Sequence, residues 1–141
     1  MSYQFSSARL STPTENNAAN EKAAESKAIA AEISGAKTVV QKGQAYVKAA
    51  QAKVNAANAK VATINKKKAY AAKATDLANA KHALSLAQGV LTKAKALLKA
   101  YQALNSAKNQ KPKAAPAAVL NQKASDAIQA EKAYQAALAQ K

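Results

Sequence analysis

The sequence predicts an all-α protein built on a long antiparallel helical hairpin, followed by a Pro-containing linker and a third, C-terminal helix. Alanine, the strongest helix former, makes up 41 of the 141 residues. Glycine and proline, which break helices, number three each. Large apolar residues recur at seven-residue intervals along much of the chain, which is typical of helices packed in pairs.

The N-terminal residues 1–12 are mostly polar and show no helical period, so we expect them to form an extended arm. A helix-start signal follows them. Thr12 is suited to cap the helix, Pro13 suits the first helical position, and Glu15 completes a capping box. The helical hairpin is therefore predicted to begin at residue 13 and to extend over residues 13–110.

Two heptad series indicate the helix–helix seam of this hairpin. In each series a large residue is followed three positions later by a mostly small one, so the seam resembles an alanine-rich coiled coil. The first series is Ile33, Val40, Val47, Val54 and Val61, and Ile64 follows it on the same seam. The second series is Tyr70, Leu77, Leu84, Leu91 and Leu98.

The two series are out of phase, because nine residues separate Val61 from Tyr70. A chain reversal in the polar run at residues 65–68 is the simplest account, and folding there pairs Ile33 with Leu98. No glycine or proline marks this turn, so a helix bend or a pairing between molecules stays open. Gly43 lies on the seam, where it fits either a close helix approach or simple tolerance of glycine.

Pro112 and Pro116 interrupt the helical pattern, so we expect a Lys/Pro linker at residues 111–116 and a C-terminal helix at residues 117–141. The sequence leaves open whether this helix folds back on the hairpin or docks on a neighbouring molecule. Because an alanine-rich seam buries little apolar surface, we expect self-association or a larger assembly. The apolar stripe predicted for this helix is Leu120, Ala124, Ala127, Ile128, Tyr134 and Leu138.

The composition argues against catalysis. The chain has no cysteine, and its one histidine, His82, occupies a position away from the seam. No glycine-rich phosphate loop, zinc-binding HExxH motif or nucleophile elbow is present. We therefore expect no enzyme, no cofactor, no metal site and no small-molecule substrate.

The positive charge is unbalanced, with 22 Lys+Arg against 7 Asp+Glu and a net charge of +15. Between Ile33 and Ser125 the chain has 17 lysines and one acid, Asp76. This surplus opposes compaction unless a polyanion supplies counter-charge, and nucleic acid is the commonest candidate. Because arginine carries much of base readout and Arg9 is the only arginine, we expect weak sequence preference.

The predicted contacts to nucleic acid are lysines distributed around the hairpin and the linker. Tyr46, Tyr70 and Tyr101 lie at or beside the seams, so the sequence does not indicate a stacking platform for single strands. Residues 108–118 resemble in composition the Lys/Ala/Pro tails of linker histones and bacterial histone-like proteins, and this resemblance implies nonspecific DNA contact. The predicted lysines are Lys37, Lys42, Lys48, Lys53, Lys60, Lys66, Lys67, Lys68, Lys73, Lys81, Lys93, Lys95, Lys99, Lys108, Lys111 and Lys113.

These features predict a nonenzymatic basic protein that binds nucleic acid or another polyanion through Lys–phosphate contacts, as a nucleoid or virion packaging component. The alternative is a structural subunit of a virion, fibre or similar assembly, in which lysine mainly solubilises and the arm docks on neighbours through Tyr3 and Phe5. Attachment to an anionic membrane surface ranks third, because alanine inserts poorly.

The sequence also bears on location. No apolar run is long enough to predict an integral membrane segment, and the N-terminus does not follow a signal-peptide pattern. The expected location is therefore intracellular, in association with the nucleoid, or inside a virus particle.

Overall fold

The computed structural model describes residues 13–141, with side chains from residue 23 onward. Within these residues the chain forms four helices and no strand, which confirms the predicted all-α class. The helices are α1 (Pro13–Ser34), α2 (Ala36–Lys66), α3 (Lys73–Lys108) and α4 (Ala117–Ala139). The predicted arm, residues 1–12 with Tyr3 and Phe5, lies outside the described residues.

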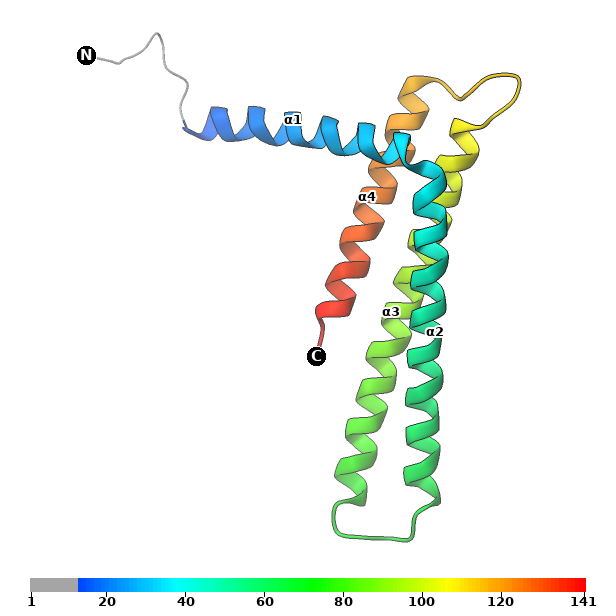
Figure 1. Cartoon of the computed structure of the whole chain (residues 1–141). Helices are drawn as coiled ribbons and strands as arrows, with labels where there is room; N and C mark the ends of the chain where they lie inside the picture. Colours follow the sequence, from blue (N-terminus) through cyan, green and yellow to red (C-terminus); the bar gives the residue numbers. More distant parts are fainter. Residues whose placement is uncertain (1–12) are drawn as a thin grey trace, which may run out of the picture.

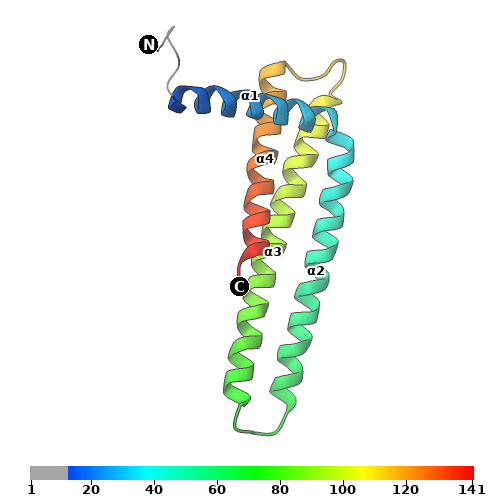
Figure 2. The same cartoon turned by 60° about the vertical axis from the view of Figure 1, so that its left-hand side comes forward.

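The two longest helices, α2 and α3, lie side by side and run in opposite directions, joined by residues 67–72 (Figure 1). We refer to this pair as the hairpin. Helix α4 folds back along α3 within the same molecule, over the half of the hairpin that is farther from the turn (Figure 2). Helix α1 runs across the end of this body and extends beyond it. The C-terminal helix therefore packs on its own hairpin, which the sequence alone left open.

The helix predicted to begin at residue 13 is interrupted at Gly35, so the hairpin spans α2 and α3 and does not include α1. Glycine has low helix propensity and Ser–Gly pairs are frequent kink sites, which makes Ser34–Gly35 the weakest point of this stretch. The Gly35 N–H donates to the Ala31 carbonyl at 2.9 Å. Lys108 Nζ donates to the Ser34 carbonyl at 3.2 Å, which satisfies one carbonyl left free at the end of α1.

Small residues fill the corner where α1 turns across α4. Ala36, Ala124 and Leu104 are each 0% exposed, and Ile29 and Ile33 pack against them. Alanine at this corner lets the helix backbones approach closely. Ile33 therefore belongs to the corner and not to the seam of the hairpin, where the heptad pattern predicts it.

Helices α2 and α3 approach each other closely at Gly43. A β-carbon on Gly43 would lie 2.9 Å from Tyr101 Cδ2 and 3.2 Å from Leu98 Cα, so a larger residue requires a shift. Leu98 thus lies opposite Gly43 and not opposite Ile33, and the predicted register is wrong. The reason is the position of the turn. Residues 65 and 66 still belong to α2, and the chain reverses only at residues 67–72.

The observed register, extended in steps of seven residues, pairs large seam residues with small ones. It places Leu91 opposite Ala50, and both belong to the main core. Val54 and Ile64 are each 6% exposed. The other members of the predicted seam that lie within α2 and α3 are half-buried, and they are Val40, Val47, Val61, Leu77, Leu84, Leu91 and Leu98.

Polar contacts fix the turn of the hairpin. Tyr70, predicted to lie on the seam, is in this turn and is 38% exposed. Its hydroxyl donates to Asp76 Oδ2 at 2.9 Å, and Asp76 in turn lies in the first turn of α3, where a negative charge complements the helix dipole. Lys73 Nζ donates to the Lys67 carbonyl. The chain therefore reverses here without glycine or proline.

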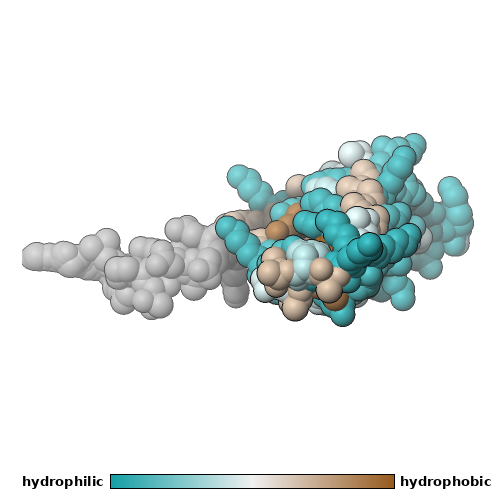
Figure 3. Space-filling view, turned by 90° about the horizontal axis from the view of Figure 1, so that it is seen from below, coloured by the Kyte–Doolittle hydropathy of each residue, from teal (hydrophilic) through white to brown (hydrophobic). Residues whose placement is uncertain are grey.

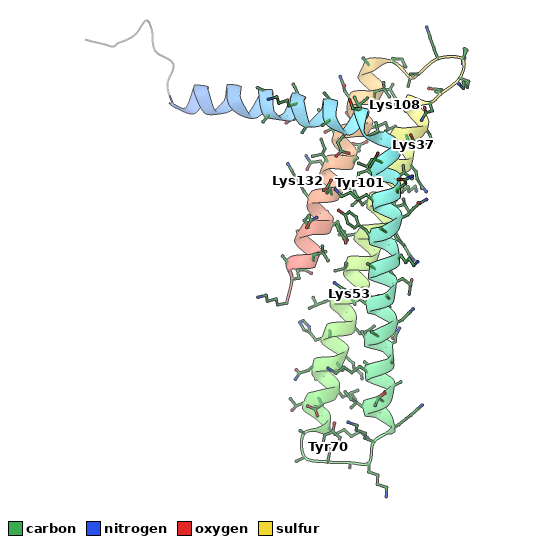
Figure 4. All side chains as sticks on the ribbon, in the orientation of Figure 1. Lys37, Lys53, Tyr70, Tyr101, Lys108 and Lys132 are labelled. Atoms are coloured by element: carbon green, nitrogen blue, oxygen red, sulfur yellow. The ribbon has the colours of Figure 1, made fainter. Side chains whose placement is uncertain are left out.

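The main core lies where α2, α3 and α4 meet. Tyr101 and Leu97 are 0% exposed. The rings of Tyr46 and Tyr134 stack with their centroids 4.7 Å apart and an interplanar angle of 25°. Figure 4 shows Tyr101 in this part of the molecule and Tyr70 at the opposite end, in the turn.

The predicted apolar stripe of α4 is only partly buried. Ala124, Ala127 and Tyr134 are buried, Leu120 and Ile128 are half-buried, and Leu138 is 38% exposed. The apolar stripe of α4 therefore becomes more exposed to solvent toward the C-terminal end of the helix. The helix itself ends at Ala139, part-way along the hairpin (Figure 1).

Candidate nucleic-acid interface

Helix α4 divides the hairpin into two halves of different chemistry. We call residues 36–50 and 90–108, which share the main core with α4, the covered half, and residues 51–89 the bare half. The bare half contains seven lysines and one acid, Asp76. Every other acid of the chain lies on α1 or α4. The turn end of the molecule is therefore strongly basic, whereas the end near α1 carries both signs of charge.

Three of the predicted lysines have partners within the protein. Lys42 Nζ lies 3.5 Å from Glu131 Oε2 and 5.6 Å from the centre of the Tyr46 ring. Lys73 and Lys108 donate to the backbone carbonyls described above. These contacts support the fold, so these three ammonium groups are weaker candidates for binding phosphate.

The remaining predicted lysines are exposed and make no side-chain hydrogen bond or ion pair with residues 23–141. Their ammonium groups are therefore accessible to a phosphate, which they contact as point charges. Seen from the turn end, hydrophilic residues form most of the outline of the molecule (Figure 3). The exposed lysines are Lys37, Lys48, Lys53, Lys60, Lys66, Lys67, Lys68, Lys81, Lys93, Lys95, Lys99, Lys111 and Lys113.

In the covered half, one heptad position of each hairpin helix faces α4. This position comes three residues after the second seam residue of each heptad. It is occupied on α2 by Val39 and Tyr46 and on α3 by Leu97 and Leu104. Tyr46 stacks on Tyr134 of α4, and Leu97 is in the same core cluster. This position therefore forms the binding surface for α4.

In the bare half the same position changes character. On α2 it is occupied by Lys53 and Lys60, and Lys67 at the C-terminal cap continues the spacing; we call these three residues the lysine row. On α3 the position is occupied by Asp76 and Ala83. Figure 4 places Lys53 near the level at which α4 ends. The sequence alone distributes the predicted lysines around the hairpin and does not single out this row, although the seven-residue spacing from Tyr46 onward is a signal for it.

An open hollow of about 420 Å³ lies at the turn end of the lysine row. Lys60, Lys67, Asp76 and Asn79 line it, together with Tyr70. The Asp76 carboxylate already accepts the Tyr70 hydroxyl, and Lys67 Nζ lies 6.0 Å from the centre of the Tyr70 ring. Two ammonium groups against one carboxylate leave this hollow net positive.

The aromatic side chains in the described part of the chain do not form an exposed stacking surface. Tyr101 is buried, and burial together with its 2.8 Å hydrogen bond to Glu131 Oε1 raises its pKa. Tyr46 of α2 and Tyr134 of α4 stack on each other where the two helices meet. Tyr70 is the exposed member, and its hydroxyl is engaged by Asp76. Stacking of successive bases needs several exposed rings, which these residues do not offer.

A polar cluster lies at the crossing of α1 and α4, away from the lysine row. It contains Glu32, Lys42, Tyr101 and Glu131. The Glu32 Oε2 atom is buried and has no hydrogen-bond partner among the side chains and backbone that the structure describes. Burial raises the pKa of the Glu32 carboxyl, the charge of Glu131 raises it further, and Lys42 acts in the opposite direction.

Neither this cluster nor the rest of the described side chains brings together three histidine, aspartate or glutamate residues able to hold a metal ion. His82 is exposed on α3. No helix in residues 13–141 has the length and apolar character needed to cross a membrane. No protein-family model, curated protein or solved structure matches this chain.

Proposed function

We propose that this chain is a nonenzymatic protein that binds nucleic acid nonspecifically through Lys–phosphate contacts, as a nucleoid or virion packaging component. The observation that carries the proposal is the charge of the bare half, seven lysines against one acid. Its exposed lysines have no carboxylate partner among the described side chains. Unpaired charge of one sign on a rigid surface favours a partner that carries the opposite sign at high density.

The mechanism follows from the chemistry of lysine. Each ammonium group that neutralises a phosphate releases condensed counterions, and this release drives binding without reading the bases. The hairpin holds the ammonium groups along a rod, because α2 with 31 residues is about 46 Å long at 1.5 Å per residue. A rod of this length presents several lysines to one stretch of nucleic acid.

The proposal is tested by the salt dependence of binding. Fluorescence anisotropy of a labelled random-sequence duplex is titrated with the full chain at several salt concentrations between about 50 and 200 mM. We expect the logarithm of the affinity to fall linearly with the logarithm of the salt concentration, with a slope of several units. An unlabelled duplex of unrelated sequence should compete equally well. Negligible binding at the lowest salt concentration would remove the proposal.

A structural role in a larger assembly is the second candidate, and the course of α1 supports it. This helix extends beyond the body formed by the other three (Figure 1). An isolated helical segment is marginally stable in water, so a neighbouring molecule that packs against the extended part of α1 would stabilise it. Sedimentation of the full chain and of a chain lacking residues 1–12 tests this role. A monomeric mass for both would exclude it, whereas a mass that falls on deletion would support it.

A further inference from the structure

We propose that the nucleic acid is bound as a duplex on one face of the bare half, the face that α4 covers in the other half of the hairpin. The lysine row, Lys53, Lys60 and Lys67, contacts the sugar–phosphate backbone there. This inference rests on the proposed function and adds to it the binding face and the form of the nucleic acid.

The first argument is the change of side chains where α4 ends. The positions that hold Val39 and Tyr46 against α4 hold lysine in the bare half, at the same seven-residue interval. A further helix packed in this place would require apolar residues at these positions. Lysines there exclude such packing and instead fit an anionic partner lying in line with α4.

The second argument is the geometry of the row. Lys53 and Lys60, seven residues apart on α2, are about 10.5 Å apart along its axis. Lys67, the residue at the C-terminal cap of α2, extends the row to about 21 Å. A straight row crosses the winding strands of a duplex and does not follow one of them. Its spacing of about 10.5 Å is close to the roughly 12 Å width of the major groove, so neighbouring lysines can reach phosphates on the two edges of the groove. A regular charge spacing on a straight helix therefore suits a regular, stiff polyanion.

The third argument is the contrast with the opposite face of the hairpin. Across the groove from the lysine row, α3 contributes Ala83, whose short side chain leaves the face open, and Asp76, whose carboxylate is engaged by Tyr70. The hollow on the opposite face lies where the covered and bare halves meet, and it is lined by Gln44, Gln51 and other mostly uncharged residues, with one lysine, Lys48. The face with the lysine row is the better complement to phosphate.

The preference for a duplex follows from the aromatic residues. Binding of single strands gains much of its strength from bases stacked on exposed rings. In the described part of the chain, Tyr46, Tyr101 and Tyr134 are occupied in the core, and Tyr70 is bonded to Asp76. The surface thus offers charge without stacking, which favours two closely spaced phosphate strands over one.

The test compares two variants with the same net charge. The first replaces the lysine row (K53Q/K60Q/K67Q). The control, matched in charge, replaces three exposed lysines on the other side of the seam, Lys81 in the bare half and Lys37 and Lys95 in the covered half (K37Q/K81Q/K95Q). Because all six side chains are exposed, both variants should retain the helical circular dichroism of the parent chain. Duplex affinity and its salt slope are measured by anisotropy for all three proteins, with a single strand of equal length as a further ligand.

We expect the row variant to lose on the order of tenfold or more in duplex affinity and to reduce the salt slope by about three units, one for each phosphate contact. The control should lose less than about threefold and keep most of the slope. Equal losses in both variants would show that charge alone matters and would overturn the assigned face while leaving the proposed function intact. Tighter binding of the single strand than of the duplex would overturn the duplex assignment. Absence of duplex binding by the parent chain would instead remove the proposed function itself.

Discussion

The covered and bare halves of the hairpin have the same backbone and the same seam but opposite surroundings. In the covered half, Leu97, Tyr101 and Leu104 are 0% exposed beneath α4. In the bare half the buried hydrophobic residues are Val54, Ile64 and Ala80, and the rest of the surface is rich in lysine. Stability is thus concentrated in one half and unpaired charge in the other.

Few residues account for the different surfaces of the two halves. The seam residues that join α2 to α3 continue through both halves. What changes on the α2 side is the heptad position that faces α4, which is Val39 or Tyr46 in the covered half and lysine in the bare half. One heptad position therefore separates a surface that packs a helix from a surface that is rich in lysine.

The largest expected effect is on folding stability. It compares the truncation of one leucine in the covered half with the truncation of one leucine in the bare half. Leu97→Ala should lower the free energy of unfolding by about 2–5 kcal/mol, since it leaves a cavity at a fully buried site. Leu84→Ala in the bare half should cost less than half as much, because Leu84 is only half-buried. Urea unfolding followed by circular dichroism measures both. Equal losses would mean that the two halves contribute equally to stability.

Two glycines provide a sharper comparison of close packing. Gly43→Ala should destabilise the protein by about 1–3 kcal/mol, because its β-carbon would crowd Tyr101 and the Leu98 backbone. Gly89→Ala should instead stabilise it by about 0.5–1 kcal/mol, since nothing lies within 4 Å of the added β-carbon and alanine favours the helix. Thermal unfolding distinguishes the two signs. Stabilisation by both substitutions would contradict the close approach at Gly43.

The sequence was sufficient for the parts of the fold that depend on local pattern. It predicted the all-α class, and its low count of glycine and proline and its heptad series both favoured long helices. It was wrong about the register, because equally spaced seams can pair at several offsets and only the length of α2 fixes the turn. The break at Gly35 has a local signal in the Ser34–Gly35 pair, but the direction in which α1 leaves the hairpin depends on its packing against α4, which the local sequence does not encode.

The candidate interface was predicted in composition but not in arrangement. The surplus of lysine and the scarcity of acids are properties of the sequence. The division into two faces is not, because it depends on where α4 lies and where it ends. Once α4 is placed, the spacing of Lys53, Lys60 and Lys67 relative to Tyr46 acquires a meaning that it lacks in the sequence alone.

The smallest expected effect concerns pH and the polar cluster in the covered half. Because burial raises the pKa of Glu32, its protonated form is favoured in the folded state. The associated stability is present below the ordinary pKa of the carboxyl and is lost as the pH rises through the folded-state pKa. Glu32→Gln should therefore stabilise the protein near neutral pH and have little effect at acidic pH. An effect independent of pH, measured by thermal unfolding, would show that Glu32 does not titrate in this way.

The most direct test of the division between the halves is a residue-by-residue map of duplex binding by nuclear magnetic resonance. Backbone amide shifts of the full chain are recorded during titration with a random-sequence duplex at low salt. We predict that the shifts change in residues 51–89 and are largest around Lys53, Lys60 and Lys67, while α4 and the buried core keep their positions. Changes centred on α1 or α4, or the absence of any change, would contradict the account.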